Sequence, residues 1–501
     1  MTISILFFFP NTTHDGVIPL AVGILSTIAK NFQCDVRYFE STFYIKSNTA
    51  TEARETTGEF RPVRNRKKQE YPPIEQLYAD FQDILNSFRP QVLAVHANSL
   101  EWELFKEVMN RIALPAPAPL VIVGGVYATL DPESVMAMPF VDAACVGEGE
   151  GAWADLIYEL KKGGDISVIK NLWVRTPQGI RKNPLRPLIS GDRLWNIPVD
   201  YSFFDERHLL KPYDGEMIYR GMIEYSRGCP FNCYYCANSA IKERFRGLGK
   251  YFRIRPFDNF QQGVKCLTNL GAEMLQLQDE CFFSNKTAEI QRFCDWYSSE
   301  IRLPLLLQTR PDSVTEDKVR LVAEMDLPVQ VSLGVESGSP RILREICNRQ
   351  MSIASIKNAF EIIHRYNLRS NAYCMIGFPT ETRDEAFMTI NLIREIKPTI
   401  AIMSIFYPFQ GVPLRKFCVN QGYINGNESA RTFTDDTILR HQHMSPDEIK
   451  NIRRCFRLYT KLPKRYLSSV ERCERNFDQS RELFKALVER SWAENPMAME
   501  G

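Results

Sequence analysis

Three cysteines in the middle of the chain have the spacing Cys-x3-Cys-x2-Cys. They are Cys229, Cys233 and Cys236. Thiolates this close in sequence can hold one compact iron–sulfur cluster. Three ligands leave one iron of a four-iron cluster open to a small molecule, as a catalytic zinc keeps one position open. The alternative is three neighbouring buried thiols. The glycine, proline and asparagine in the same run form loops rather than core, and they favour the cluster.

Length and composition limit the classes of protein that the chain can belong to. It has 501 residues, 44% of them hydrophobic, which predicts two to four domains. A net charge of +2 gives no strong attraction to nucleic acid. We find no run of about 18 apolar residues, so we expect no membrane span. Thirteen cysteines without a recognisable secretory signal predict a reducing, cytoplasmic location.

The first part of the chain alternates short apolar runs with amphipathic ones. This alternation predicts a parallel, doubly wound, Rossmann-like sheet. A polar stretch over residues 47–73 is expected to be a loop insertion. The expected strands are residues 3–9, 35–39, 92–96, 120–123 and 143–146, and the expected helices are residues 18–31, 74–88 and 102–112.

Glycine-rich turns follow two of these strands. One is Gly124-Gly125, and the other is Gly147-Glu148-Gly149-Glu150. In a doubly wound sheet, ligands bind beyond the carboxyl ends of the strands, and glycine lets the backbone approach a ligand closely. Tight turns without a ligand are the alternative, and the pattern alone does not choose between the two.

Strand and helix patterns alternate again after residue 216, and six such units predict an incomplete barrel. The active side of such a barrel is the carboxyl end of its strands, and the three cysteines directly follow the first strand. The expected strands are residues 222–225, 274–278, 305–308, 329–333, 371–375 and 400–406.

The cysteine run, with the aromatic Tyr235 before its last cysteine, resembles the cluster loop of the radical S-adenosylmethionine (SAM) superfamily. The runs Gly334-Val335-Glu336-Ser337-Gly338 and Met375-Ile376-Gly377-Phe378-Pro379 resemble further motifs of that family. The resemblance implies a [4Fe-4S] cluster held by the three cysteines, with SAM on the open iron. It also implies SAM contacts at Tyr235, Asp279, Glu280, Arg310, Ser332, Glu336, Ser337 and Ile376.

The run Val121–Thr129, together with the turn at Gly147, resembles the cobalamin-binding domain of cobalamin-dependent radical SAM enzymes. Many cobalamin domains carry Asp-x-His-x-x-Gly with a cobalt-ligating histidine, but here only His14 is present at that place. We therefore expect His14 to be a polar loop residue, and a cobalt ligand is the alternative. The resemblance implies cobalamin contacts at Asn11, Thr12, Ser99, Gly124, Gly125, Gly147, Glu148 and Gly149.

These patterns divide the chain into four parts. Residues 1–165 form the cobalamin-binding domain, residues 166–215 a linker, residues 216–420 the partial (β/α)6 radical SAM barrel and residues 421–501 a mostly helical region. His441 and His443 in the last part lack a cysteine or carboxylate beside them, so we expect surface residues rather than metal ligands.

The resemblance implies a cobalamin-dependent radical SAM enzyme that methylates an unactivated carbon of a small molecule. It would use a 5′-deoxyadenosyl radical and methylcobalamin, with electrons from an external donor such as flavodoxin or ferredoxin. Oxidative cyclisation or rearrangement without methyl transfer is the first alternative, because the motifs report the cofactors and not the substrate. A non-catalytic cobalamin or redox sensor and an enzyme that has lost cobalamin are the others. No single catalytic residue is identified.

Overall fold

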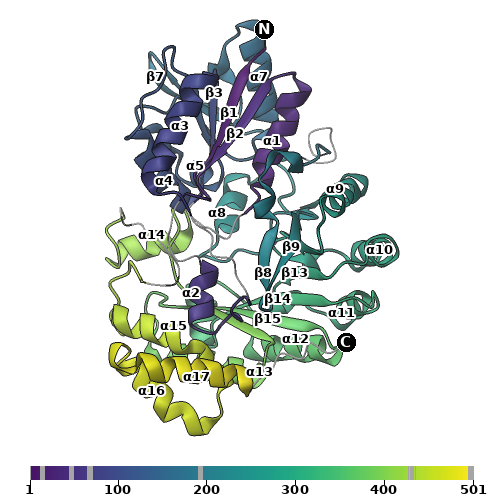
Figure 1. The fold of residues 1–501 in the computed structure, drawn as a ribbon, viewed down its shortest axis with the longest axis vertical. Coiled ribbons are helices and arrows are strands. Elements are labelled where there is room, and N and C mark those ends of the chain that lie inside the picture. Colours follow the sequence, from purple (N-terminus) through teal and green to yellow (C-terminus); the bar gives the residue numbers. More distant parts are fainter. Residues whose placement is uncertain are drawn as a thin grey trace.

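A computed structural model describes residues 2–11, 17–44, 50–64, 71–189, 196–426, 428, 434 and 436–494. Two sheets, each covered by helices, follow one another along the long axis, and helices from the end of the chain lie at the far end of the second sheet (Figure 1). The α/β class, the doubly wound first sheet, the partial barrel and the helical C-terminal region are confirmed.

The first sheet has the strand order β2-β1-β3-β4-β5-β6-β7. The strands from β2 to β5 are parallel, and β6 and β7 are antiparallel additions at one edge. The strands are β1 (Ser4–Phe9), β2 (Asp35–Glu40), β3 (Val92–His96), β4 (Leu120–Gly124), β5 (Ala143–Cys145), β6 (Leu172–Thr176) and β7 (Gly179–Lys182). Their helices are α1 (Leu20–Asn31), α3 (Ile74–Phe88), α4 (Ser99–Met109), α5 (Val126–Leu130), α6 (Pro132–Met136) and α7 (Glu150–Lys162).

Helices on both faces explain why β1 is almost entirely apolar. Phe8 points to one face, where its ring lies 4.5 Å from that of Phe81 on α3. Phe7 points to the other face, where its ring lies 5.4 Å from that of Trp153 on α7. A strand covered on both faces has no polar side, so it reads as a continuous hydrophobic run.

The second sheet curls into a partial barrel with the order β16-β15-β14-β13-β12-β9-β8. The six strands from β9 to β16 are parallel, as expected, and β8 is antiparallel to β9. The strands are β8 (Leu210–Tyr213), β9 (Glu216–Ile223), β12 (Met274–Leu277), β13 (Leu305–Thr309), β14 (Val329–Glu336), β15 (Arg369–Ile376) and β16 (Ile400–Ile405). The helices around them are α8 (Ala237–Arg244), α9 (Phe257–Asn269), α10 (Thr287–Trp296), α11 (Glu316–Ala323), α12 (Ile353–Arg365) and α13 (Arg383–Ile396).

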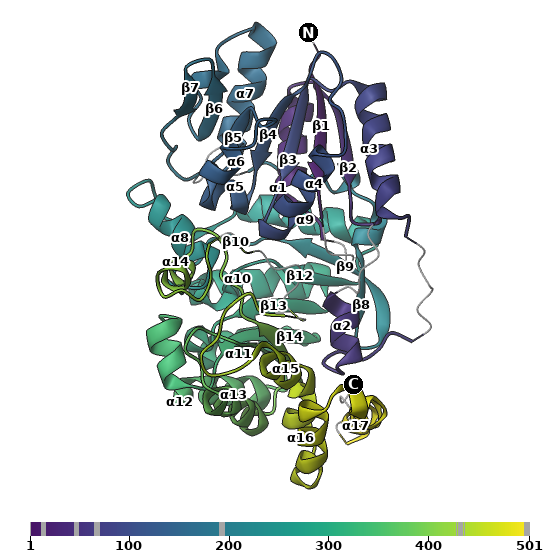
Figure 2. The ribbon, with the colours of Figure 1, turned by 90° about the vertical axis from the view of Figure 1, so that its left-hand side faces the viewer.

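Two segments differ from the sequence expectation. The stretch expected to be an irregular linker contains β6 and β7, which extend the first sheet, and β8, which extends the second. These strands have only four or five residues, too few for a periodic pattern to stand out. The expected loop insertion contains helix α2 (Ala50–Thr56), which lies beside the barrel and not beside the first sheet (Figure 2).

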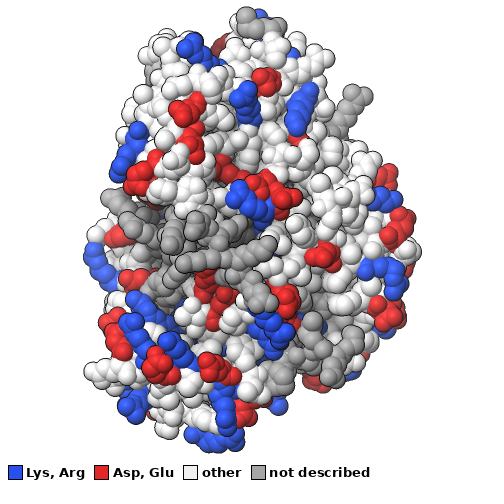
Figure 3. Space-filling view, in the orientation of Figure 1, with Lys and Arg blue, Asp and Glu red and all other residues white. Residues whose placement is uncertain are grey.

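Four helices make up most of the end of the chain that the structure describes. They are α14 (Pro413–Asn420), α15 (Pro446–Lys461), α16 (Leu467–Arg475) and α17 (Arg481–Ala493). Ser445 and Glu448 form a capping box at the start of α15, with Pro446 at its first turn. No helix in the described part is both long and apolar enough to cross a membrane. Both signs of charge are interspersed on the face in Figure 3, as the small net charge predicts.

Candidate functional site

The cysteine loop follows the first parallel strand of the barrel. A short ribbon of β10 (Ser226–Arg227) and β11 (Arg253–Ile254) leads into it. Gly228 has φ +85°, and a Cβ there would lie 2.4 Å from the carbonyl oxygen of Tyr251. Because no side chain fits at that distance, the residue before the first cysteine must be glycine.

Contacts from several parts of the barrel hold the loop in place. The backbone N–H of Tyr234 donates to the carbonyl of Cys347 at 3.0 Å, and the N–H of Leu414 donates to the carbonyl of Tyr234 at 3.0 Å. The ammonium of Lys242 on α8 donates to the carbonyl of Pro230 at 2.7 Å. The loop is therefore positioned by groups that follow it in the chain, some of them more than 100 residues away.

The three thiols suit a cluster better than a single ion. No three His, Cys, Asp or Glu side chains in the described part of the chain converge as ligands of one metal ion. A four-iron cluster does not require that convergence, because each cysteine binds a different corner. Burial raises the pKa of Cys229 and Cys236 to about 12, so these thiols lose their protons only when iron replaces them.

Tyr235, Glu336 and Arg310, all predicted to contact SAM, lie around this loop. The hydroxyl of Tyr235 donates to Oε1 of Glu336 at 3.0 Å. Nη1 of Arg310 lies 3.0 Å from the Sγ of Cys233, and its guanidinium also pairs with Asp312 at 2.6 Å. The expected carboxylate-binding arginine is thus positioned by an acidic neighbour directly beside the cluster loop.

Arg349 belongs to the same group and was not identified from the sequence. Its Nη1 donates to the hydroxyl of Tyr235 at 2.7 Å and to Oε1 of Glu336 at 3.0 Å. Its side chain is only 2% exposed, and a buried guanidinium requires such partners. Glu336 has φ +66°, a strained conformation for glutamate that these contacts hold.

Of the other residues predicted to contact SAM, Asp279 has a structural role that the hydrogen bonds show. Asp279 is fully buried and accepts from the backbone N–H groups of Tyr225 and Ser226, so it fixes the start of the cysteine loop. Burial raises its pKa to about 7. Glu280, which follows Asp279 in the chain, is exposed. Ser332, Ser337 and Ile376 are buried, and their predicted roles remain predictions.

A cavity of about 330 Å³ lies at the carboxyl edge of the first sheet. Five of the eight residues predicted to contact cobalamin line it: Gly124, Gly125, Gly147, Glu148 and Gly149. The opposite wall comes from the barrel domain and includes Ile241, Phe245, Tyr251 and Arg253. Both domains therefore build this cavity, whereas the sequence resemblance assigned it to one. A cavity of this kind fits the expected cofactor, because backbone can approach it closely from one side.

Gly125 and Gly147 need to be glycine for different reasons. Gly125 has φ +98°, and a Cβ would lie 2.7 Å from the carbonyl oxygen of Ala97 in the same domain. Gly147 has φ +91°, and a Cβ would lie 2.2 Å from the ring of Phe245 in the barrel domain. The second glycine thus allows the two domains to approach each other.

Asn11 and Ser99, which were also predicted to contact cobalamin, are not among the described residues that line this cavity. The side chain of Asn11 is buried and donates to Thr42 at 3.0 Å, and Ser99 begins α4. Thr12 and His14 lie outside the described residues. The roles predicted for these positions stay predictions.

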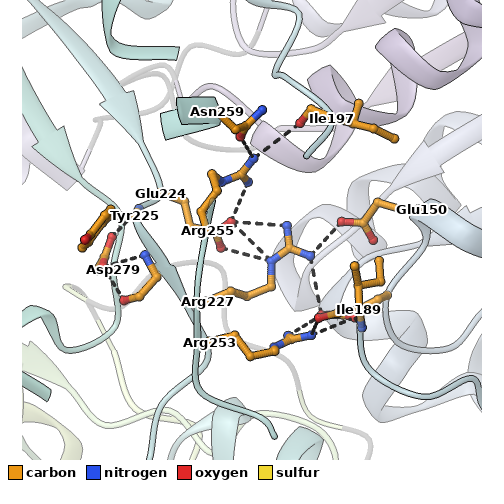
Figure 4. A network of polar contacts seen from close by, with 12 residues as sticks. Glu150, Ile189, Ile197, Glu224, Tyr225, Arg227, Arg253, Arg255, Asn259 and Asp279 are labelled. Atoms are coloured by element: carbon orange, nitrogen blue, oxygen red, sulfur yellow. Dashed lines mark hydrogen bonds and ion pairs between the residues drawn. The ribbon is translucent and has the colours of Figure 1, made fainter. Parts of the chain in front are cut away.

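A network of charged side chains joins the two domains between the cavity and the cysteine loop (Figure 4). Arg227, two residues before Cys229, donates to Glu150 at 2.7 Å and lies 3.3 Å from Glu224 and 3.5 Å from Glu148. Arg253 pairs with Glu148 as well. The two glutamates of the glycine-rich turn therefore contact the barrel domain.

Neighbouring arginines lower the pKa of two carboxylates of this network, Glu148 and Glu224. Burial alone would raise the pKa of Glu148, yet Arg253 and Arg227 hold it below its ordinary value. Burial acts in the same way on Glu224, and Arg227 and Arg255 lower its pKa in turn. Arg255 also donates to Asn259 at 2.9 Å. The arginines within hydrogen-bond distance thus lower the pKa of Glu148 and Glu224 by more than burial raises it.

Two protein-family models match the chain. Residues 223–393 match the Radical SAM superfamily, and residues 68–157 match the B12 binding domain. The first match contains the cysteine loop and most of the barrel, and the second contains both glycine-rich turns.

Three similar proteins illustrate these matches. "Uncharacterized methyltransferase PH0819" of Pyrococcus horikoshii is 25% identical over 390 residues, which cover 75% of this chain and 80% of that protein. The anaerobic magnesium-protoporphyrin IX monomethyl ester cyclase of Synechocystis is 27% identical and is matched over 54% of this chain and 52% of its own length. The fold resembles that of TsrM, a radical SAM methyltransferase from Kitasatospora setae solved with cobalamin and a [4Fe-4S] cluster. Its TM-score is 0.62 at 16% identity, over 86% of this chain and 80% of TsrM.

Proposed function

The chain belongs to the cobalamin-dependent radical SAM enzymes, and we propose that it transfers a methyl group to an unactivated carbon of a small molecule. One observation carries the proposal. The cavity at the glycine-rich turns is closed on its far side by the barrel domain, and Arg227 links both turn glutamates to the cysteine loop. A shared wall of this kind suits chemistry that uses both cofactors on one substrate. Methyltransferase is also the named activity of the Pyrococcus relative and of TsrM.

When bound, the cluster with SAM supplies the radical that removes hydrogen from carbon, and cobalamin supplies the methyl group. The residues of the chain bind and orient these groups. Cys229, Cys233 and Cys236 hold the cluster. Arg310, which Asp312 holds through Nε and Nη2, places its positive charge and its Nη1 donor beside Cys233 for a carboxylate. Glu336, which Arg349 holds in position, accepts hydrogen bonds from hydroxyl groups.

The reaction needs electrons from outside the chain, and we assign them to a small donor protein such as flavodoxin or ferredoxin. We place the enzyme in the cytoplasm. All thirteen cysteines are free thiols, which suits a reducing compartment.

Anaerobic reconstitution tests the cluster assignment. Protein with the three cysteines intact should bind iron and sulfide and cleave SAM to 5′-deoxyadenosine after reduction. The variant Cys233→Ser should lose both properties and keep its cobalamin. Cys473→Ser, which changes an equally buried thiol far from the loop, is the matched control and should retain all three. Normal cluster content in Cys233→Ser would refute the assignment.

Labelled SAM distinguishes methyl transfer from the alternatives. With a 13C label in the methyl group, methyl transfer places the label in the product and releases S-adenosylhomocysteine. A cyclase would give a product without the label and with fewer hydrogens. A sensor would form no 5′-deoxyadenosine, even with the cluster fully loaded.

A further inference from the structure

His96 lies at the centre of the carboxyl edge of the first sheet. It is the last residue of β3, and β3 lies between β1 and β4 in that sheet. His96 lines the cavity of about 330 Å³, and among the histidines that the structure describes it alone does so. Alternate residues of a strand point to the same face, so His96 shares a face with Ala94, which also lines the cavity. The imidazole therefore belongs to the cavity wall, at the edge where a doubly wound sheet binds its ligands.

The neighbouring strands leave space on one side of the imidazole and fill the other. Gly124 of β4 is opposite His96 in the register of the two strands, and its missing side chain leaves the cavity open there. Phe9, at the end of β1, packs against the imidazole with its ring centroid at 5.6 Å and an angle of 71° between the ring planes. An aromatic neighbour at this distance restricts the rotation of the imidazole.

Glu101 of α4 places a carboxylate beside one nitrogen of this ring. Its Oε2 lies 3.4 Å from Nδ1 of His96. The backbone N–H of Asn98 donates to the same oxygen at 2.7 Å, and Nδ2 of Asn98 donates to Oε1 at 2.8 Å. These bonds belong to the capping box at the start of α4, so the carboxylate, which is only 5% exposed, has a fixed position. A fixed carboxylate beside Nδ1 favours the tautomer that carries its proton on that nitrogen.

The two nitrogens of His96 have different surroundings. Nδ1 is buried, and at 3.4 Å from Glu101 it has no full hydrogen bond to any residue in the described part of the chain. The side chain as a whole is 24% exposed, so its accessible part is the rest of the ring, which carries Nε2. A neutral imidazole with its proton on Nδ1 has a lone pair on Nε2. His96 thus offers the cavity a nitrogen that can bind a metal.

The charged side chains that also line the cavity pair with one another. Arg227 pairs with Glu150 and Glu224. Arg253 pairs with Glu148. These five side chains form the contact between the two domains, and their polar atoms are occupied there. The imidazole of His96 takes no part in that network.

We propose that Nε2 of His96 binds the cobalt of cobalamin from the side of the first sheet, and that Glu101 is the positioning residue that orients the ring. Imidazole nitrogen binds first-row transition metals, and the second nitrogen of a metal-bound histidine commonly donates to a carboxylate. His96 and Glu101 have this arrangement. The proposal rests on the proposed function for the assignment of the cavity to cobalamin. It places the ligand at the end of β3, whereas the sequence pattern offered His14 as the alternative.

Electron paramagnetic resonance of bound cob(II)alamin tests the ligand on the unmodified chain. The anaerobically reconstituted protein is loaded with hydroxocobalamin, and ascorbate reduces the cobalt while the cluster stays oxidised and silent. One coordinated 14N splits the cobalt lines into triplets, and these should become doublets when the protein carries 15N-histidine. The dimethylbenzimidazole of cobalamin carries no label. Triplets that survive the labelling, or lines without nitrogen splitting, would therefore overturn the proposal.

Variants of the two histidines identify the residue that causes the splitting. His96→Ala should lose the doublets and bind hydroxocobalamin at least about tenfold more weakly in equilibrium dialysis. His14→Ala should keep both the doublets and the affinity. Doublets that persist in His96→Ala and vanish in His14→Ala would assign the ligand to the other histidine and overturn the proposal. A loss of affinity in His96→Ala with unchanged doublets would also overturn it, because His96 would then contact cobalamin away from the cobalt.

Glu101→Gln tests the positioning role, since glutamine also forms capping boxes and leaves the start of α4 intact. The doublets should remain, and the affinity for hydroxocobalamin should fall about tenfold. Glu103→Gln, which changes an exposed carboxylate on the same helix, is the matched control and should bind like the unmodified chain. Equal affinities of the two variants would overturn the role of Glu101. An unmodified chain that binds no cobalamin would contradict the proposed function as well, whereas bound cobalamin without histidine splitting would overturn this inference alone.

Discussion

Replacing Arg227 with glutamine should weaken the docking of the two domains beside the cavity, which Arg227 also lines. Among the described residues, only Arg227 contacts all three carboxylates of the network, at 2.7 Å for Glu150, 3.3 Å for Glu224 and 3.5 Å for Glu148. The consequences differ among the three. Glu224 retains Arg255, and Glu148 retains Arg253. Glu150 has no other ion pair in the described part of the chain.

The free-energy cost of Arg227→Gln should therefore come mainly from Glu150, whose buried carboxylate loses its ion-pair partner. Its side chain is 7% exposed, and removing one partner of a buried ion pair costs about 3–5 kcal/mol. Arg227 is 22% exposed, so we take the lower end, about 3 kcal/mol. Glu150→Gln should cost only about 1 kcal/mol, because Arg227 keeps two carboxylates. The double variant leaves no unpaired charge at this point and should cost about 1–2 kcal/mol, which gives a coupling of about 2 kcal/mol.

Cobalamin affinity is the assay, measured by equilibrium dialysis with hydroxocobalamin. Residues of both domains line the cavity, so domain docking and cobalamin binding are linked. Since about 1.4 kcal/mol corresponds to a factor of ten, Arg227→Gln should raise the dissociation constant by up to about a hundredfold. The double variant should recover about tenfold or more of that loss.

Arg246→Gln is the matched control, because it removes an exposed arginine that pairs with Glu243 at the end of α8. Its affinity for cobalamin should not change. The reasoning fails if the double variant binds cobalamin no better than Arg227→Gln alone. It also fails if Arg246→Gln produces the same loss.

Three further changes have directions that follow from the structure. Gly125→Ala should weaken cobalamin binding about tenfold, because the new Cβ would lie 2.7 Å from the carbonyl oxygen of Ala97 beside the cavity. Gly163→Ala has the same kind of backbone strain at φ +69°, but no atom lies within 4 Å of its Cβ and it does not line the cavity, so cobalamin affinity should not change; equal affinities of the two variants would contradict this. Burial raises the pKa of Glu381 from 4.5 to about 8, so the stability due to this group is complete below about pH 4.5 and is lost as the pH rises through 8. The melting temperature of Glu381→Gln should then fall less between about pH 5 and pH 8 than that of the unmodified chain, and parallel pH profiles would exclude the effect. Arg453→Met leaves the carboxylate of Glu59 buried without its partner and should lower the stability by about 3–5 kcal/mol, seen as a reduced melting temperature; an unchanged value would show that the pair carries no stability.

The sequence predicts the regular parts of both domains because their strands are covered on both faces. Val92–His96 and Ile74–Phe88 have the predicted bounds, since long apolar runs and clear helical periodicity leave little ambiguity. The added strands β6, β7 and β8 escape prediction, because they are short and antiparallel. Helix α2 escapes it as well, because a polar segment looks like a loop until the barrel and α15 bury part of it.

Local motifs identify the residues near the cofactors but not the contacts that hold them. The cysteine run and the glycine turns are visible in one stretch of sequence each. Arg349 is not, because its partners Tyr235 and Glu336 are 114 and 13 residues away. No spacing rule connects residues that only the closed barrel brings together. The same holds for Glu59, whose partner Arg453 is 394 residues further along the chain.

The turn Gly147-Glu148-Gly149-Glu150 shows how one short motif can serve two requirements. Gly147 and Gly149 line the cavity that we assign to cobalamin, and Gly147 also makes room for Phe245 of the barrel domain. The two glutamates point to Arg227, two residues before the first cysteine. A glycine-only turn would allow the same close approach but would lack the ion pairs with Arg227. The carboxylates add these contacts to the others between the two domains, so one motif contributes both to the predicted cobalamin site and to its position relative to the cysteine loop.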